Sequence, residues 1–299
     1  MHVYPKLNSQ EHVNRYFTLE AGYWDSVYRR EDLVGAIYRR RQTAAIEMLG
    51  RTSLTSEAKI LEIGCGSGQL TVALAKQGFF VDAMDSVSAM LELTRRNVAA
   101  AGVGDRVHTH LGDVHRLGFE ARSFDAIIAL GVLPWIFAPN LALKEMERVA
   151  KLGGYLLFTV DNRNRLNNLL DPGLNPFLEP LKTSIKNLLE VTRLRPKKYR
   201  AELPRMHSIG EVTTMLSEHN LDLVAMVTVG FGPFTFFGKR ILPDALGRAV
   251  DHFFQWAANK QLPPFRTTGS HCLVLAAKHD VSDEITVTEE LLEHVGVAV

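Results

Sequence analysis

Short apolar runs alternate with amphipathic stretches through the middle of the chain. From Lys59 onward, the β-like segments KILEIG, FFVDAMD, RVHTHLGD, SFDAIIALG and GGYLLFTVD are separated by stretches with apolar residues at helical spacing, such as VSAMLELTRRNVAAAG and LALKEMERVA. LDLVAMVTVG and GSHCLVLAAK complete seven strands. This alternation is typical of parallel βαβ units with right-handed crossovers. The sequence therefore predicts an α/β fold with a doubly wound, Rossmann-like, seven-stranded sheet.

The same pattern divides the chain into parts that differ in the spacing of their apolar residues. Before the first strand, LVGAIYRRRQTAAIEML and the residues ahead of it predict two helices, and after Asp161 prolines and turn residues break the alternation. The predicted parts are an N-terminal helical cap (1–57), a cofactor-binding core (58–161), an inserted helical lid (162–206), the rest of the core (207–280) with an aromatic-rich insertion (231–264), and an acidic tail (281–299).

The amino-acid composition indicates which classes of binding partner to expect for this protein. The chain has 34 basic and 33 acidic side chains, a formal charge of +1, which provides no overall attraction for nucleic acid. Two cysteines, Cys65 and Cys272, are too few for a disulfide framework. The first residues, MHVYPKLNSQ, do not resemble a secretory signal, and no apolar run is long enough to span a bilayer. We therefore expect a cytoplasmic protein with a small-molecule substrate, and a homodimer is compatible with these features.

Three glycines between the first strand and the first helix indicate a ligand held close to the backbone. In GCGSG (residues 64–68) they occupy alternate positions, and glycine permits dihedral angles that bring backbone N–H groups against a ligand. A dinucleotide motif, GxGxxG, would need glycine at Gln69, which disfavours an NAD-dependent dehydrogenase. Asp85 and Asp113 end the next two strands, where carboxylates suit an adenosine that carries no phosphate. A tight turn without a ligand is the alternative.

With LEIGCGSG, DAMDSVSAML, LGDVHRL, FDAIIALGVL and KLGGYLLF in this order, residues 59–160 resemble the class I S-adenosylmethionine-dependent methyltransferases. Among them, the chain looks most like the ubiquinone/menaquinone-type and natural-product enzymes. The resemblance implies S-adenosyl-L-methionine as cofactor, with Asp85 at the ribose and Leu130 beside the sulfonium. The cofactor-binding residues it implies are Gly64, Gly66, Asp85, Ser86, Asp113, Val114 and Leu130. Leu152 stands where the family usually has proline, a difference that affects a turn.

The predicted cap contributes further candidates for the cofactor site. An arginine about twenty residues before the first strand pairs with the cofactor carboxylate in this family, and Arg41 has that position. Alternatively, residues 39–41 are a solvated arginine face of one helix. Trp24 and Tyr28 are candidates for an aromatic lid over the sulfonium, with core packing as the alternative.

The acceptor side is predicted from the aromatic residues that follow the core strands. Trp135, Phe231 and Phe234 are the candidates for an apolar acceptor pocket, although packing of the insertion also explains the phenylalanines. His207, at the start of the helix after the lid, is the candidate general base. GVLPWIFAPN contains no Glu or His, and the histidines at 108, 110 and 115 lack metal-site spacing, so no metal is expected.

These observations predict methyl transfer to a lipophilic small molecule, most simply to oxygen, by in-line displacement under the lid. N- or C-methylation of a metabolite or prenyl-type lipid remains open, as does a non-catalytic cofactor-binding protein. Between Lys182 and Arg205 the chain has eight basic and two acidic residues, which suggests peripheral contact with an anionic membrane or a solvated helix face.

Overall fold

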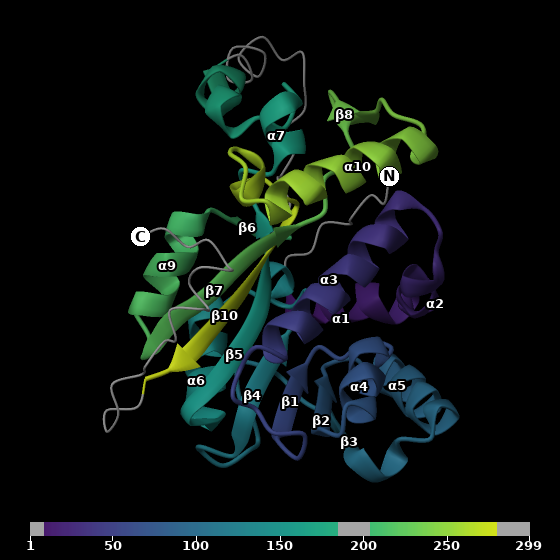
Figure 1. The fold of residues 1–299 in the computed structure, drawn as a ribbon, viewed down its shortest axis with the longest axis vertical. Helices are drawn as coiled ribbons and strands as arrows, with labels where there is room; N and C mark the ends of the chain where they lie inside the picture. Colours follow the sequence, from purple (N-terminus) through teal and green to yellow (C-terminus); the bar gives the residue numbers. More distant parts are fainter. Residues whose placement is uncertain (1–8, 185–203, 280–299) are drawn as a thin grey trace.

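The computed structural model describes residues 9–184 and 204–279, which contain the predicted sheet (Figure 1). Its main strands, in spatial order, are β3 (Val107–Leu111), β2 (Phe80–Asp85), β1 (Lys59–Ile63), β4 (Phe124–Ala129), β5 (Ala150–Asn162), β10 (His271–Lys278) and β7 (Leu221–Val229). The first five are parallel, whereas β10 is antiparallel to both of its neighbours. The short β6 (Met206–His207) pairs with the end of β5. The predicted Rossmann-like fold is confirmed.

Helices cover both faces of this sheet. On one face lie α3 (Leu33–Leu49), α4 (Gln69–Lys76) and α5 (Ser88–Ala101), and on the other α6 (Pro139–Val149) and α9 (Ile209–Ser217). Successive side chains of a strand point to opposite faces, so Ile60 packs in the first layer and Leu61 in the second. Burial on both faces explains why the strands read as continuous apolar runs. The sheet is thus a rigid platform for residues at its strand ends.

The N-terminal cap contains one more helix than the sequence predicts. Residues 10–49 form α1 (Gln10–Leu19), α2 (Ala21–Ser26), the 3₁₀ turn η1 (Val27–Arg29) and α3. A new helix, α3, begins directly after Asp32. The Asp32 side chain caps this helix by accepting a hydrogen bond from the Gly35 N–H (3.0 Å). The hydrophobic pattern does not show the break between α1 and α2, because Tyr16 and Trp24 belong to the same aromatic cluster.

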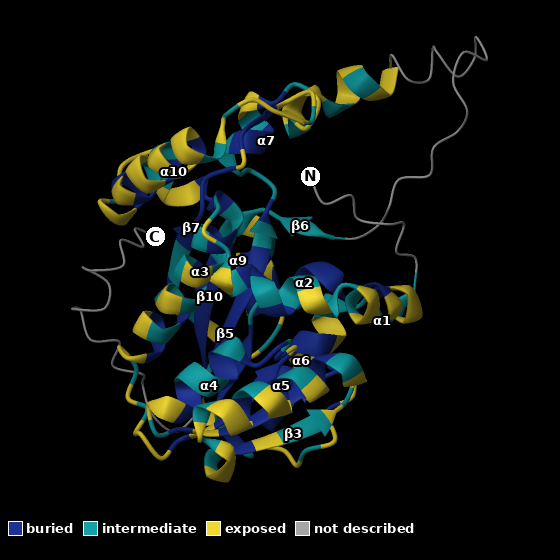
Figure 2. Cartoon of the chain, turned by 90° about the vertical axis from the view of Figure 1, so that its right-hand side faces the viewer, coloured by how far each residue is buried: buried dark blue, intermediate teal, exposed yellow. Residues whose placement is uncertain are grey.

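The predicted insertions meet beside the end of β5. The first contributes α7 (Leu166–Leu170) and η4 (Pro176–Leu178), and the second β8 (Thr235–Phe236), β9 (Lys239–Arg240), α10 (Asp244–Asn259) and η5 (Phe265–Thr267) (Figures 1 and 2). Asp171 joins them by accepting hydrogen bonds from the Thr235 hydroxyl (2.5 Å) and the Gly238 N–H (2.9 Å). The basic part of the lid (185–203) and the tail lie outside the described residues, and the part boundaries remain predictions.

Two further 3₁₀ turns, η2 (Gly104–Arg106) and η3 (Leu133–Trp135), connect core elements. Across residues 9–184 and 204–279, none of the helices combines the length and apolar character needed to cross a bilayer.

Candidate functional site

A cavity of about 850 Å³ lies at the carboxyl ends of β1, β2, β4 and β5. The sheet side of the cavity is formed by the glycine turn after β1 and by the ends of the neighbouring strands, and the opposite side by α1, α2, η1 and α3. Residues of both insertions complete its outer end. Ligands of open α/β sheets bind at this edge, so the cavity is the candidate site.

The glycine turn leaves room for a ligand in the cavity. Gly64 and Gly66 have positive φ values (68° and 55°), which glycine adopts without strain. A Cβ on Gly64 would lie 2.5 Å from a methyl carbon of Val132, so only glycine fits there. A Cβ on Gly66 would meet no atom within 4 Å, and Gly66 lines the cavity. A side chain at Gly66 would therefore occupy the space that the turn leaves open.

Asp85 is fixed at the bottom of this turn. Its carboxylate accepts hydrogen bonds from the N–H groups of Gly66 (2.9 Å) and Val87 (2.9 Å), and the residue is 8% exposed. Burial raises the pKa of Asp85, although these N–H groups favour the charged form. Each carboxylate oxygen retains a free lone pair for a ribose hydroxyl. Next to it, the Ser86 hydroxyl donates to Asn14 Oδ1 (3.0 Å) and links α1 to the strand end.

The end of β3 forms the next part of the cavity wall. Asp113 and Val114 both line the cavity, as the resemblance implies. Asp113 Oδ1 accepts a hydrogen bond from the backbone N–H of His115 (2.9 Å) and lies 2.6 Å from the ring Nδ1 of His115. His115 itself does not line the cavity. From α1, the Gln10 side chain brings a buried Oε1 without a hydrogen-bond partner. An adenine amino group would satisfy such an acceptor.

Arg41 is a buried cation that enters the cavity from α3. It is 6% exposed, its guanidinium lies 4.5 Å from the centre of the Tyr38 ring, and Nη2 donates to the Tyr28 hydroxyl (3.3 Å). Its Nε has no hydrogen-bond partner, and among the described residues no carboxylate lies within ion-pair distance. Burial opposes its charge, yet Tyr28, Tyr38 and Asp161 outweigh burial and raise the pKa of Arg41. An anionic ligand group would relieve this unpaired charge.

The two arginines next to Arg41 have other contacts. The alternative that residues 39–41 together form a solvated arginine face of α3 therefore does not describe Arg41. Arg39 donates to the Tyr28 carbonyl (2.9 Å), and Arg40 pairs with Asp251 of α10 (2.7 Å). The three guanidinium groups therefore point to different surroundings, and of these three only Arg41 lines the cavity.

Aromatic side chains of the cap and η3 form the remaining wall. Trp24, Tyr28 and Trp135 all line the cavity, and Leu130 lies at its sheet side. The Trp135 ring stacks on the Tyr16 ring, with 5.8 Å between their centres. Trp135 therefore packs in the aromatic cluster of the cap and lines the cavity as well. The buried Nε1 of Trp24 has no hydrogen-bond partner. The wall is thus apolar, with single polar atoms that can orient a ligand.

Three predicted site residues do not line the cavity. Phe231 and Phe234 are buried against Ala258 of α10; both rings contact Phe254, and the Phe231 ring also contacts Phe265. Packing within the insertion, the alternative to an acceptor pocket, accounts for both phenylalanines, because they fill the small core of the insertion itself. His207 is half-buried in β6, where burial lowers its pKa and its Nδ1 has no hydrogen-bond partner. The structure therefore does not bring His207 to the cavity.

A histidine–carboxylate pair that the sequence analysis missed does line the cavity. His271 Nδ1 lies 3.0 Å from Asp161 Oδ1, and the two residues are direct partners in the antiparallel pairing of β10 with β5. Burial raises the pKa of Asp161, but His271, Arg165 and Arg41 outweigh it, and the pKa lies below its usual value. The sequence contains both residues at strand ends, but it does not show that β10 inserts next to β5.

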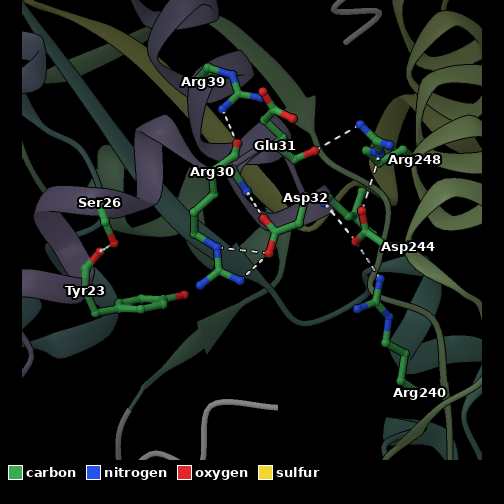
Figure 3. A network of polar contacts seen from close by, with 11 residues as sticks. Tyr23, Ser26, Arg30, Glu31, Asp32, Arg39, Arg240, Asp244 and Arg248 are labelled. Carbon is green, nitrogen blue, oxygen red and sulfur yellow. Dashed lines mark hydrogen bonds and ion pairs between the residues drawn. The ribbon is translucent and has the colours of Figure 1, made fainter.

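Polar contacts at the outer end hold the cap against α10, including a hydrogen bond from Arg248 to the Glu31 carbonyl (2.9 Å) (Figure 3). Asp244 pairs with Arg240 (2.8 Å) and Arg248 (3.4 Å), and it accepts a hydrogen bond from the Leu33 N–H (3.1 Å). On the cap side, Arg30 pairs with Asp32. Because Arg30, Asp32 and Arg240 also line the cavity, this network forms part of its rim.

Within the described ranges, no group of three His, Cys, Asp or Glu side chains is arranged to hold a metal ion.

Comparison with known proteins identifies the core. Residues 61–158 match the model of a methyltransferase domain family. Malonyl-[acyl-carrier protein] O-methyltransferase of Priestia megaterium is 34% identical over 116 residues, 38% of this chain and 40% of the relative. Ubiquinone biosynthesis O-methyltransferase of Coxiella burnetii is 29% identical over 105 residues, 35% of this chain and 44% of the relative. The alignments thus cover less than half of these curated relatives.

Solved structures share the fold over most of the chain. The [4+2]-cyclase SpnF matches with a TM-score of 0.60 and 15% identity, covering 92% of this chain and 98% of that one. Magnesium protoporphyrin IX methyltransferase of Synechocystis PCC 6803, solved with bound SAH, matches with a TM-score of 0.57 and 13% identity, covering 90% and 99%. Residues 61–158 therefore confirm the predicted methyltransferase domain.

Proposed function

We propose that this protein transfers a methyl group from S-adenosyl-L-methionine to a lipophilic small molecule, with oxygen as the acceptor atom. The observation that carries the proposal is the composition of one cavity. The cavity has the features that a phosphate-free adenosyl cofactor requires, namely the open glycine turn and Asp85 on its sheet side and the unpaired Arg41, which enters from α3. Its other side is aromatic and apolar, with Trp24 and Trp135 as members. One cavity thus serves both reactants of a transfer reaction.

In this proposal the chain's residues mainly bind and align. Asp85 accepts the ribose hydroxyls, Arg41 binds the methionine carboxylate in a bidentate manner, and Leu130 packs beside the reacting sulfur. The cofactor supplies an electrophilic methyl group, and the aromatic wall excludes water and holds the acceptor in line with it. The hydrogen bond from the Leu33 N–H to Asp244 and the ion pair of Arg40 with Asp251 keep the cap in place against α10 during this alignment.

Two alternatives would use the same cofactor side of the cavity. N- or C-methylation would use the same cofactor side and differ only in the acceptor. The fold is shared with a [4+2]-cyclase, and a fold does not determine a function, so cofactor binding without methyl transfer is the candidate from another class.

Calorimetric titration tests the proposal. We expect micromolar binding of S-adenosylmethionine and of its demethylated product and no binding of NAD, which serves as the control. Incubation with methyl-labelled cofactor and a panel of quinols, phenols, amines and lipids then separates the alternatives by the atom that gains the label. Failure of a folded sample to bind either form of the cofactor would contradict the proposal. Binding without transfer to any acceptor would favour the non-catalytic alternative.

We also propose that the insertions contact an anionic bilayer, which would give access to a lipophilic acceptor. Leu246, Phe253 and Trp256 are each more than half exposed and lie on one side of α10, whose outer side Figure 2 shows as exposed. Phe253 and Trp256 stack at 5.9 Å, and Arg248 and Lys260 are exposed on the same helix or at its end. Aromatic and cationic residues together favour an anionic bilayer surface.

The double variant Phe253→Ser/Trp256→Ser is expected to lose at least about tenfold in affinity for phosphatidylglycerol-containing vesicles, because two buried aromatic contacts are removed. Co-sedimentation measures the affinity. Leu111→Ser is the matched control, since Leu111 is 66% exposed but lies on the edge strand β3. Equal binding by the double variant and the wild type, or equal binding to uncharged vesicles, would contradict the proposed contact.

A further inference from the structure

We propose that His271, oriented by Asp161, is the general base that removes the acceptor proton during methyl transfer. This inference rests on the proposed function and adds a residue for which the sequence patterns provided no signal. Both side chains line the cavity, and among the described residues that line it His271 is the only imidazole.

The backbone of β5 and β10 fixes this pair. His271 and Asp161 are opposite each other in the antiparallel ladder, and adjacent hydrogen bonds from Asn162 N to Ser270 O (3.0 Å) and from Ser270 N to Gly230 O (2.6 Å) hold the start of β10. The side chains are 15% and 22% exposed. A pair placed on rigid strands, with limited exposure, keeps its geometry when a ligand enters.

The hydrogen bond to Asp161 determines which ring nitrogen can act. Asp161 is a carboxylate and accepts only, so His271 Nδ1 carries the proton in this pair and Nε2 retains its lone pair. The carboxylate then stabilises the imidazolium that forms when Nε2 takes a proton. Arg165 and Arg41 act on the same carboxylate and keep it charged.

The position of His271 relative to the proposed cofactor suits proton removal. The Tyr38 ring is close to both groups, with the Arg41 guanidinium 4.5 Å and the His271 ring 6.3 Å from its centre. Because Arg41 is proposed to bind the methionine carboxylate, His271 lies on the part of the cavity wall next to the methionine end of the cofactor. Glu62, Asp85 and Asp113 lie on the cofactor side, and Asp32 is paired with Arg30.

The step balances without another reactant. The acceptor O–H bond breaks and its proton moves to His271 Nε2. The oxygen forms a bond to the methyl carbon, the S–CH₃ bond breaks, and its electron pair stays on sulfur, which becomes a neutral thioether. The positive charge lost at sulfur is thus replaced by the imidazolium charge, which lies beside the Asp161 carboxylate.

The charged and titratable groups that face His271 come from three elements. Asp161 of β5 and Tyr38 of α3 contact His271 directly. Arg165, just after β5, and Arg41 of α3 act on Asp161, and Tyr28 of η1 contacts both Arg41 and Tyr38. Among the described residues, none of these groups forms a hydrogen bond with Nε2, so this nitrogen is available to take the acceptor proton.

The decisive variant is His271→Asn, whose side-chain amide can still donate to Asp161 but has no basic nitrogen. With 4-nitrocatechol and a reduced naphthoquinone as probe acceptors, we expect kcat to fall about 100-fold, the pH dependence to flatten and cofactor affinity to remain unchanged. His219→Asn is the matched control, because His219 also faces a carboxylate, Glu147 (3.9 Å), but lies away from the cavity. We expect it to retain the wild-type rate and pH profile.

Other results would overturn the proposal. It fails if His271→Asn keeps the wild-type rate and pH profile, or if His207→Asn shows the loss and His271→Asn does not. If the wild type methylates neither probe, ¹⁵N spectra of its imidazoles with the demethylated cofactor and 4-nitrocatechol decide. An Nδ1–H tautomer of His271 whose Nε2 signal moves on addition of the phenol supports the pair, and any other result overturns it. Absence of cofactor binding would instead contradict the proposed function and is measured separately by calorimetry.

Discussion

Replacing Asp85 with alanine is expected to weaken binding of S-adenosylmethionine by about two to four orders of magnitude. Two charge-assisted hydrogen bonds to ribose hydroxyls are lost, each contributing about 1.5 to 3 kcal/mol. The glycine turn also loses its support, because the N–H groups of Gly66 and Val87 no longer have an acceptor. Calorimetric titration of the folded variant measures the affinity.

The same strand provides the control for Asp85. Asp82 is also a buried carboxylate of β2 (5% exposed), but it pairs with His110 (2.6 Å) and Lys59 (3.3 Å) and does not line the cavity. Asp82→Ala should lower stability yet leave cofactor affinity within about twofold, since its contacts lie outside the site. If both variants lost affinity equally, damage to β2 would explain the loss. If Asp85→Ala kept the wild-type affinity, Asp85 would have no role at the ribose.

The cofactor side of the cavity was predictable from the sequence because its residues are adjacent in the chain to the strand ends. In a parallel sheet, the residues that follow successive strands converge at one edge whatever the order of the strands. Gly64, Gly66, Asp85 and Asp113 follow this rule and all line the cavity. The family resemblance pointed to Arg41 through its distance from the first strand; Arg41 lines the cavity from α3, and its role at the cofactor stays a prediction.

The acceptor side was less predictable because it depends on contacts between distant segments. Phe231 and Phe234 are residues of the type that lines apolar pockets, but the direction of their side chains depends on α10, against which they pack. The pairing of His271 with Asp161 requires β10 to insert antiparallel next to β5, and the apolar run GSHCLVLAAK fits any buried position in the sheet. His207 was placed by chain order alone, and β6 holds it outside the cavity lining.

Glu62→Gln is expected to make the cofactor-free protein more stable at alkaline pH, by up to about 5 kcal/mol. Glu62 is 4% exposed, accepts a hydrogen bond from the Thr71 hydroxyl (2.5 Å) and lines the cavity. Burial, together with the negative charge of Asp85, raises the pKa of Glu62 from 4.5 to about 8, despite the opposing hydrogen bond. Between these two values the folded protein binds a proton that the unfolded chain has released.

The sign of the pH dependence follows from that proton. The stability it contributes is fully present below pH 4.5 and is lost as the pH rises to about 8, so the free energy of unfolding falls across this window. Glutamine keeps an acceptor for Thr71 and takes up no proton, so the variant should lack this decline. Denaturant unfolding at pH 5 and pH 9 measures the difference.

Glu145→Gln is the control with the opposite sign. Arg148 holds the pKa of Glu145 below its usual value, so the charged form of Glu145 stabilises the fold at neutral pH and its loss should destabilise the protein there. A Glu62→Gln variant with the same pH dependence as the wild type would show that Glu62 is charged in the folded protein. If Glu62 is protonated, a cofactor ammonium bound beside it should release that proton near pH 7. Calorimetry in buffers of different ionisation enthalpy would detect the release and would connect the buried carboxyl to cofactor binding.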